Sequence, residues 1–267
     1  MSTSCCPTEI RPAVNDYQGT GSRVTLDGHF DMYIVKGSSP NCLILVHDIF
    51  GLTSNAEQLA DTLSTVGGYT VVIPDFYKGD PWPHTNIPPT KEGKFPKGVE
   101  PADGVQPLMT WITTAPVNQF DKNEAFQAIK EHMIQEQGIT GKFGTVGMCW
   151  GGKVSFAAAK GGLVDAVAAC HGSFLDKTDA EETNVPMCLL NSKDEPERYT
   201  TEIKPIMMEG KPLLAEKNVF KTFSKMHHGW MGTRGVDVVT DFQKEELKHG
   251  FAEGVSDLVN FFNAALA

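Results

Sequence analysis

The six-residue stretch Gly147-Met148-Cys149-Trp150-Gly151-Gly152 constrains the fold of this chain more than any other segment. A short apolar run (143–146) precedes it, and small residues at helical spacing (153–160) follow it. Strand, sharp turn and helix form the context in which the G-x-S-x-G pattern makes a nucleophile elbow. Glycines flank such a turn because its backbone is strained and closely packed, which leaves no room for a Cβ. The stretch predicts a nucleophile at a strand-to-helix turn, with sulfur in place of oxygen.

Cys149 has two interpretations on this stretch alone. A nucleophilic cysteine reacts as the thiolate, which the N–H groups and macrodipole of a helix N-terminus stabilise. A structural cysteine would be a small buried side chain beside a packing Gly-Gly pair, since free cysteine is often buried. The hexapeptide leaves both open, and the rest of the chain has to decide.

The bulk composition places the chain among ordinary globular proteins. Its 267 residues are 40% hydrophobic and 21% charged, which suits one large α/β domain with a substantial core. The net charge of −10 argues against nucleic acid and anionic membrane surfaces as partners. The first ten residues have no apolar core, and the apolar runs are too short to span a bilayer, so we expect a cytoplasmic protein, a monomer or homodimer.

The cysteines indicate free thiols in a reducing compartment. No two of the six cysteines stand at a C-x-x-C or zinc-like spacing. Cys42, Cys170 and Cys188 lie in apolar, strand-like runs and are predicted to be small core residues, whereas Cys5 and Cys6 lie in a polar N-terminal tail.

Apolar runs and helical patterns alternate along the chain. Residues 24–35 alternate around Asp27-Gly28, which predicts a β-hairpin. Ser54 and Glu57 form a capping-box pattern at the start of a helix that Gly67-Gly68 ends. Further buried strands are predicted at Cys42–Val46, 69–73, 143–146, 164–170, 187–190 and 219–223, and further helices at 123–137, 153–160, 242–247 and 255–266.

Strands alternating with helices imply a mostly parallel central sheet with helices on both faces. We predict an N-terminal tail (1–23) and a single α/β domain (24–267). The segment 78–105 changes character, because six prolines lie between Asp80 and Gly104 and no period is apparent. A loop this long is a candidate wall of a substrate site, with a surface excursion as the alternative.

Polar residues follow three of the predicted strands, where a parallel sheet gathers its reactive groups. Cys149 follows one strand, Asp194 the strand 187–190, and His228 the strand 219–223. Nucleophile, acid and histidine stand in the α/β-hydrolase order. His228 would take the thiol proton and Asp194 would orient the imidazole. Gly229 favours His228 over its neighbour His227, and His171 is interpreted as structural.

The oxyanion of an acyl-transfer intermediate needs two N–H donors. We predict the N–H of Trp150, directly after the nucleophile, and the N–H of Ile49, in the loop after the strand Cys42–Val46. Five aromatic residues are candidates for lining an apolar substrate site, with an equally good alternative as core residues: Phe50, Tyr77, Trp82, Trp150 and Trp230.

Together, these motifs resemble the dienelactone hydrolase family of the α/β-hydrolase fold. The resemblance runs from about residue 24 to the C-terminus. It implies hydrolysis of lactones or activated esters of a small molecule through Cys149, His228 and Asp194, with no metal or organic cofactor. The motifs that carry it are 47–52 (HDIFGL), 72–77 (VIPDFY), 147–153 (GMCWGGK), Lys193-Asp194 and 228–230 (HGW).

The resemblance also implies a role for Asp48 and marks one departure. In the bacterial members an acidic residue at the position of Asp48 engages the resting thiol, but there it is the longer Glu. A carboxylate near Cys149 would disfavour the thiolate and protect the thiol from oxidation. Those enzymes carry a substrate-binding arginine four residues beyond the catalytic histidine, where this chain has Gly232, while Arg234 lies two residues further on.

Three other functions remain as alternatives. A thioesterase would use the same residues on a closely related bond. A glycan hydrolase would need two facing carboxylates, and the sequence suggests no such pair. A non-catalytic small-molecule binder is possible because fold does not fix function, although a pure binder has no need of all three groups.

Overall fold

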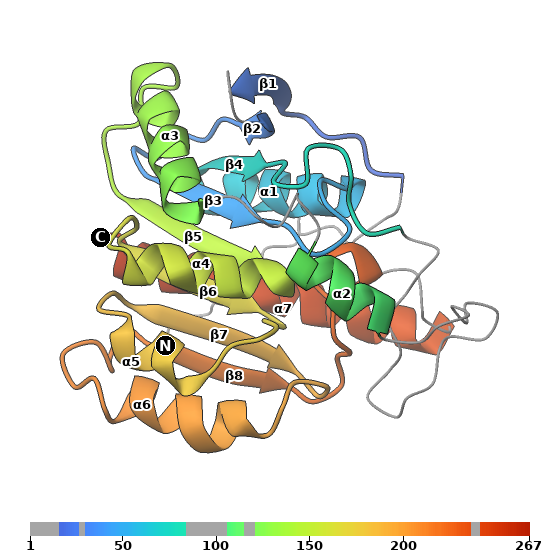
Figure 1. The fold of residues 1–267 in the computed structure, drawn as a ribbon, viewed down its shortest axis with the longest axis vertical. Helices are drawn as coiled ribbons and strands as arrows, with labels where there is room; N and C mark the ends of the chain where they lie inside the picture. The colour runs from blue at the N-terminus through green and yellow to red at the C-terminus, as the bar shows by residue number, and fades with distance from the viewer. Residues whose placement is uncertain (1–15, 27–29, 84–105, 115–120, 236–240) are drawn as a thin grey trace, which may run out of the picture.

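The computed structural model describes residues 16–26, 30–83, 106–114, 121–235 and 241–267. One eight-stranded sheet in the order β1-β2-β4-β3-β5-β6-β7-β8 forms its centre (Figure 1). The strands are β1 Ser22–Leu26, β2 Phe30–Val35, β3 Cys42–Val46, β4 Thr70–Pro74, β5 Phe143–Met148, β6 Ala166–Cys170, β7 Met187–Ser192 and β8 Val219–Phe223. The helices are α1 Ser54–Gly67, α2 Gln106–Thr114, α3 Lys122–Gln135, α4 Trp150–Lys160, α5 Lys177–Glu182, α6 Lys204–Met208 and α7 Asp241–Ala265.

The sheet is parallel from β4 to β8 and antiparallel only at the β1 and β2 edge. The strands β3, β4, β5, β6 and β7 are buried along their whole length, as continuous apolar runs require. The predicted mostly parallel α/β fold is confirmed. All the loops that follow β3 to β8 leave from one edge of the sheet, where the predicted polar residues lie.

The predicted hairpin is confirmed as β1 and β2, which pair antiparallel in register from Ser22↔Ile34 to Leu26↔Phe30. Its turn, Asp27-Gly28, lies outside the described residues. The segment just before β1 is attached to the domain, because the Asp61 carboxylate of α1 accepts hydrogen bonds from the Tyr17 hydroxyl (2.8 Å) and the Thr20 N–H (2.7 Å).

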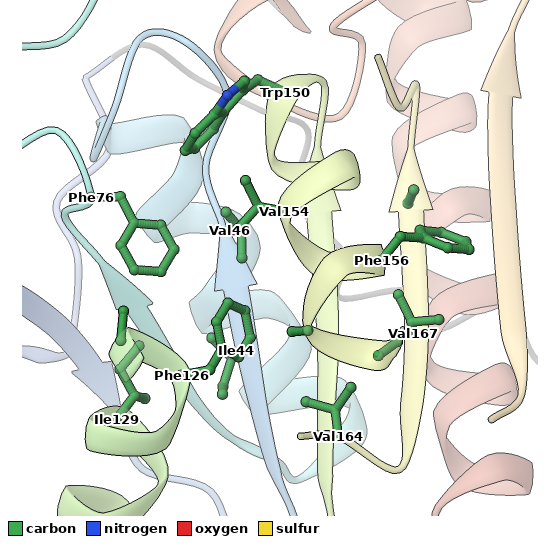
Figure 2. Packing of buried hydrophobic residues seen from close by; sticks show 14 of the residues in the cluster. Ile44, Val46, Phe76, Phe126, Ile129, Trp150, Val154, Phe156, Val164 and Val167 are labelled. Carbon is green, nitrogen blue, oxygen red and sulfur yellow. The ribbon is translucent and has the colours of Figure 1, made fainter. Parts of the chain in front are cut away.

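Two helical layers cover the sheet, and each buries a separate apolar cluster. On one face α3, α4, α5 and α6 pack against the strands, as the side chains of Phe126, Ile129, Val154 and Phe156 illustrate (Figure 2). On the other face α1 and the long α7 lie side by side (Figure 1). The clusters are named here the α4-side core and the α7-side core.

Three details of the predicted helices are wrong. Thr53, and not Ser54, caps α1: its backbone is extended, and its hydroxyl accepts from the Ala56 N–H, because Ser54 is already helical. The two predicted C-terminal helices are one continuous helix, α7. The helical spacing of 123–137 predicts Ile134 on the same side as Ala125, Phe126, Ile129 and Met133, but Ile134 is 50% exposed and only the other four are buried.

The proline-rich segment falls outside the described residues from 84 to 105. The first part of this segment is described. Trp82 is buried, and its backbone N–H donates to the Ile49 carbonyl (2.9 Å). The Trp82 ring lies 5.5 Å from that of Trp111 on α2, a helix that the sequence analysis did not predict. Of the helices in the described ranges, none combines the length and apolar character that crossing a bilayer requires.

Candidate active site

Cys149 forms a strained turn between β5 and α4. Its backbone has φ 53° and ψ −117°, a region that non-glycine residues rarely adopt, and it occupies the N-cap position of α4. A Cβ on Gly147 would lie 2.1 Å from the Gly151 carbonyl oxygen, and one on Gly151 would lie 2.3 Å from the Val46 carbonyl oxygen. The geometry matches the predicted elbow, and the two glycines are there because neighbouring backbone fills the space.

Lys153, the last residue of the elbow motif, anchors α4. Its Nζ lies 2.6 Å from Oδ2 of Asp179, a fully buried carboxylate on α5, and 3.0 Å from Oδ2 of Asp176. Lys160, at the end of α4, also pairs with Asp179 at 3.0 Å. Lys153 therefore joins α4 to α5.

His228, in the loop after β8, pairs with Glu195. Its Nδ1 lies 2.7 Å from the Glu195 Oε1. Asp194, which the sequence analysis placed against this ring, instead accepts a hydrogen bond from the His228 backbone N–H through Oδ2 at 2.9 Å. The two adjacent acids thus contact different parts of His228: Asp194 binds its backbone N–H, and Glu195 binds its imidazole.

Glu195 is well placed to orient a histidine. Its side chain is 2% exposed, and it accepts hydrogen bonds from the Ser192 backbone N–H and from the Ser192 hydroxyl (3.1 Å). Sequence reasoning missed this residue. Asp194 and Glu195 are consecutive, and only the greater length of the glutamate side chain distinguishes the one that reaches the ring.

The charges around His228 favour its protonated form. Burial alone would lower the pKa of the imidazole, but the interactions with Cys149 and Glu195 outweigh burial and raise this pKa to about 10. A hydrogen bond between the Cys149 and His228 side chains contributes to that shift. The ring therefore bridges the thiol and the carboxylate.

Neither His227 nor His171 occupies this bridging position. The Nε2 of His227 lies 3.0 Å from the Arg234 carbonyl oxygen. His171, at the end of β6, is fully buried, and its ring lies 5.2 Å from that of His228 in an edge-to-face arrangement. Burial holds the pKa of His171 well below its usual value, and the neighbouring His228 adds to this effect. His171 thus packs as a neutral ring against the back of His228.

The Asp48 carboxylate accepts hydrogen bonds from backbone N–H groups of two loops. Its Oδ1 accepts from the Phe50 N–H (2.9 Å) and its Oδ2 from the Thr233 N–H (3.0 Å), and the Thr233 hydroxyl adds a third hydrogen bond at 3.2 Å. A Cβ on Gly232 would lie 2.7 Å from the Asp48 Oδ2, which explains the glycine there. The carboxylate joins the loops after β3 and β8, and a different side chain, Ser173, lies with its Oγ 3.3 Å from the Cys149 Sγ.

One predicted oxyanion donor, Trp150, belongs to the elbow itself, and the other, Ile49, to the loop after β3. Trp150 is the first residue of α4, and its N–H therefore has no partner within the helix. Ile49 lies in a tight turn that the Gly51 N–H closes on the Asp48 carbonyl (3.1 Å). His47 positions this turn: its Nδ1 lies 2.8 Å from the Asp48 carbonyl, and its Nε2 lies 3.2 Å from the Phe76 N–H.

The predicted substrate-site aromatics separate into two groups. Phe50, Tyr77 and Trp150 belong to the α4-side core, against which Cys149 packs. Tyr77 is fully buried, and within the described residues its hydroxyl has no hydrogen-bond partner. Burial raises the pKa of Tyr77 well above its usual value, with smaller contributions from Cys149 and Asp48.

Trp230 lies elsewhere. It is fully buried in the α7-side core, with its ring 4.5 Å from that of Phe223. A Cβ on Gly254 of α7 would lie 2.6 Å from the Trp230 ring. Trp230 therefore packs under α7, across the sheet from the cluster that holds Cys149, and it is not retained as a substrate residue. The described part of the chain groups no three His, Cys, Asp or Glu side chains as metal ligands.

Comparison with known proteins connects this geometry to one family. The dienelactone hydrolase family model matches residues 30–260. The chain belongs to the dienelactone hydrolase family. Membership makes it a hydrolase of the α/β-hydrolase fold, in agreement with the sheet and the elbow.

Individual relatives align with most of this chain. An uncharacterized AIM2 family protein of Schizosaccharomyces pombe is 32% identical over 98% of this chain and 99% of its own length. The human carboxymethylenebutenolidase homolog is 25% identical over 87% of each chain. The crystal structure of a putative dienelactone hydrolase from Klebsiella pneumoniae shares the fold, with a TM-score of 0.62 and 14% identity over 91% of this chain and 98% of that one.

Proposed function

We propose that this protein hydrolyses small lactones or activated esters of carboxylic acids, with Cys149 as the nucleophile and a covalent acyl-enzyme as the intermediate. The observation that carries the proposal is the Cys149–His228–Glu195 array: a strained cysteine at a helix N-terminus, an imidazole beside it, and a buried carboxylate 2.7 Å from the far nitrogen of that imidazole. Nucleophile, base and orienting acid in this relation are the requirements of covalent acyl transfer.

The proposed reaction has two halves. The Glu195 contact assigns Nδ1–H as the donor to the carboxylate, which leaves Nε2 as the nitrogen that would take the thiol proton. The sulfur attacks the acyl carbon, and the ester oxygen leaves with the proton that His228 carries. His228 then takes a proton from water, the resulting hydroxide attacks the thioester carbon, and the sulfur leaves as thiolate.

Glu195 replaces Asp194 in this proposal as the acid of the triad. The carboxylate of Glu195 is buried and directed at the ring, and it would stabilise the imidazolium that forms at each step. Asp194 keeps an indirect role, since it fixes the backbone that carries His228.

The developing negative charge on the acyl oxygen would fall between the N–H groups of Trp150 and Ile49. Tyr77 supports substrate binding from the same side: its buried hydroxyl is unpartnered in the described part of the chain, and its ring lies 5.0 Å from that of Trp150, the residue after Cys149. A buried hydroxyl without a partner costs about 1–3 kcal/mol, which a bound acyl group could recover by accepting its hydrogen bond.

Hydrolysis of p-nitrophenyl acetate tests the proposal. The wild-type protein should turn over this ester, and Cys149→Ala should abolish turnover while the buried-thiol control Cys42→Ala keeps it. Unchanged turnover in Cys149→Ala would refute a cysteine mechanism. A panel of acyl thioesters measured beside the oxygen esters then separates an esterase from a thioesterase.

A non-catalytic binder is the remaining alternative. Its Cys149 would react with iodoacetamide at neutral pH no faster than the thiol of free cysteine, whereas an activated Cys149 should react faster than that reference although it is half-buried. Absence of ester turnover together with slow alkylation of Cys149 would favour the binder.

A further inference from the structure

The loop after β6 lies against the nucleophile. Its residues His171, Gly172, Ser173 and Phe174 pass beside the elbow, and the Ser173 Oγ lies 3.3 Å from the Cys149 Sγ, within hydrogen-bond distance for sulfur. Ser173 lies outside the sequence motifs that carry the family resemblance.

This loop is fixed in place by several hydrogen bonds. The Ser173 N–H donates to the Cys149 carbonyl (2.8 Å), and the Cys149 N–H donates to the Cys170 carbonyl (3.2 Å). The Tyr199 hydroxyl spans the loop: it donates to the Gly172 carbonyl (3.1 Å) and accepts from the Leu175 N–H (3.0 Å). The loop and the elbow therefore form one hydrogen-bonded unit.

The backbone of the loop is strained on both sides of Ser173. His171 has φ 41° and Phe174 has φ 61°, and these are left-handed values for residues other than glycine. Such conformations are unfavourable and persist where the surroundings impose them, often at functional sites. Strain and hydrogen bonds together hold the Ser173 hydroxyl beside the sulfur.

We infer that Ser173 is a further catalytic residue, whose hydroxyl donates a hydrogen bond to the Cys149 sulfur and stabilises the thiolate before it attacks. The inference rests on the proposed role of Cys149 as the nucleophile. It gives to a neutral hydroxyl the contact with the thiol that the sequence analysis expected from Asp48, whose oxygens are taken by Phe50 and Thr233.

A carboxylate and a hydroxyl beside the Cys149 sulfur have opposite effects on its ionisation. A carboxylate beside the sulfur would oppose ionisation, whereas a hydroxyl donor lowers the free energy of the anion without adding charge. In the proposed step, the Cys149 proton goes to His228 and the Ser173 proton stays on its oxygen. As the S–C bond forms, the sulfur loses its negative charge and the hydrogen bond weakens.

The pH profile of Cys149 alkylation by iodoacetamide tests this inference directly, because it reports the thiolate without any substrate. In Ser173→Ala, the midpoint of the profile should rise by roughly one pH unit, with about tenfold slower alkylation near neutral pH. Ser173→Thr keeps the hydroxyl and should stay close to the wild type. The other titratable groups near the thiol are unchanged in both variants: His228, Tyr77, Asp48, His171 and Glu195.

A purely structural role of Ser173 would leave the midpoint unmoved, and overlapping profiles of Ser173→Ala and wild type would overturn the inference. If the alanine variant folds poorly, Tyr199→Phe provides a second test, since it frees the loop while keeping Ser173 and should move the midpoint in the same direction. An unshifted midpoint in Tyr199→Phe would then count against the inference. The proposed function fails separately, through loss of Cys149-dependent ester turnover in the wild type.

Discussion

His228 Nδ1 lies 2.7 Å from Oε1 of Glu195, while the carboxylate of Asp194, one residue earlier, reaches only the backbone N–H of the same histidine. Asp194 thus fixes the backbone of His228, and Glu195 orients its ring. This division is the feature of the site that differs most from the expectation drawn from the sequence, and it separates the effects of two similar substitutions.

Glu195→Gln should reduce kcat for p-nitrophenyl acetate by roughly 10³–10⁴-fold, because the loss of the carboxylate that orients a catalytic histidine has an effect of this size in serine proteases. Asp194→Asn should cost less than about tenfold, since an amide oxygen still accepts from the His228 N–H. Steady-state kinetics of the two variants side by side decide the matter. A larger loss in Asp194→Asn would return the triad acid to Asp194.

The stability of the protein should depend on pH through His228. Its pKa is raised from 6.5 in the unfolded chain to about 10 in the folded state, so folding favours the imidazolium. The corresponding stability is fully present below pH 6.5 and is lost as the pH rises through about 10. We therefore expect the difference in free energy of unfolding between wild type and Glu195→Gln to shrink from pH 6.5 toward pH 10. A difference that stays constant in urea titrations over this range would contradict the ion pair.

Gly151→Ala should destabilise the elbow by about 1–3 kcal/mol or prevent folding, because the new Cβ would lie 2.3 Å from the Val46 carbonyl oxygen. Gly138→Ala provides the control: its Cβ would meet nothing within 4 Å, and only the cost of its left-handed φ of 73° applies. Urea unfolding of both variants makes the comparison. Equal losses of unfolding free energy in the two variants would mean that the elbow can accommodate a Cβ at position 151.

Tyr77 and Trp230 should respond differently to conservative substitution. Tyr77→Phe removes a buried hydroxyl from the cluster against which Cys149 packs and should raise KM for small esters severalfold with little change in stability. Trp230→Phe removes ring atoms from the α7-side core and should lower the free energy of unfolding by about 1–3 kcal/mol while leaving KM unchanged. A raised KM in Trp230→Phe would bring that residue back to the substrate site.

Asp48→Asn should destabilise the protein by about 1–3 kcal/mol, since an amide NH₂ cannot accept from the Thr233 N–H that the carboxylate now satisfies. Thermal unfolding measures this loss. If the variant kept wild-type stability and only the alkylation rate of Cys149 changed, Asp48 would act on the thiol and not as a link between loops.

The parallel sheet could be predicted because each central strand is buried on both faces and therefore reads as a continuous apolar run, as in Cys42–Val46. The elbow could be predicted because Gly147 and Gly151 leave a local signature of backbone crowding. Cys149 and His228 followed from their places after β5 and β8.

The contacts that depend on side-chain reach could not be predicted. The sequence does not say whether Asp194 or Glu195 reaches the imidazole, nor that Phe50 and Thr233 occupy the carboxylate of Asp48. Ser173 gave no signal either, since its position depends on a strained loop held by Tyr199, 26 residues away (199 − 173). These details come from packing between loops of different strands, and no local pattern encodes them.

The most direct test of the central claim is identification of the acylated residue by peptide mass spectrometry after rapid acid quench of the wild-type protein with p-nitrophenyl acetate. The account predicts one acetyl group on Cys149, formed in a burst within the first turnover and absent from Cys149→Ala. Ester turnover with no acetyl group on Cys149, or with the group on another residue and activity retained in Cys149→Ala, would contradict it.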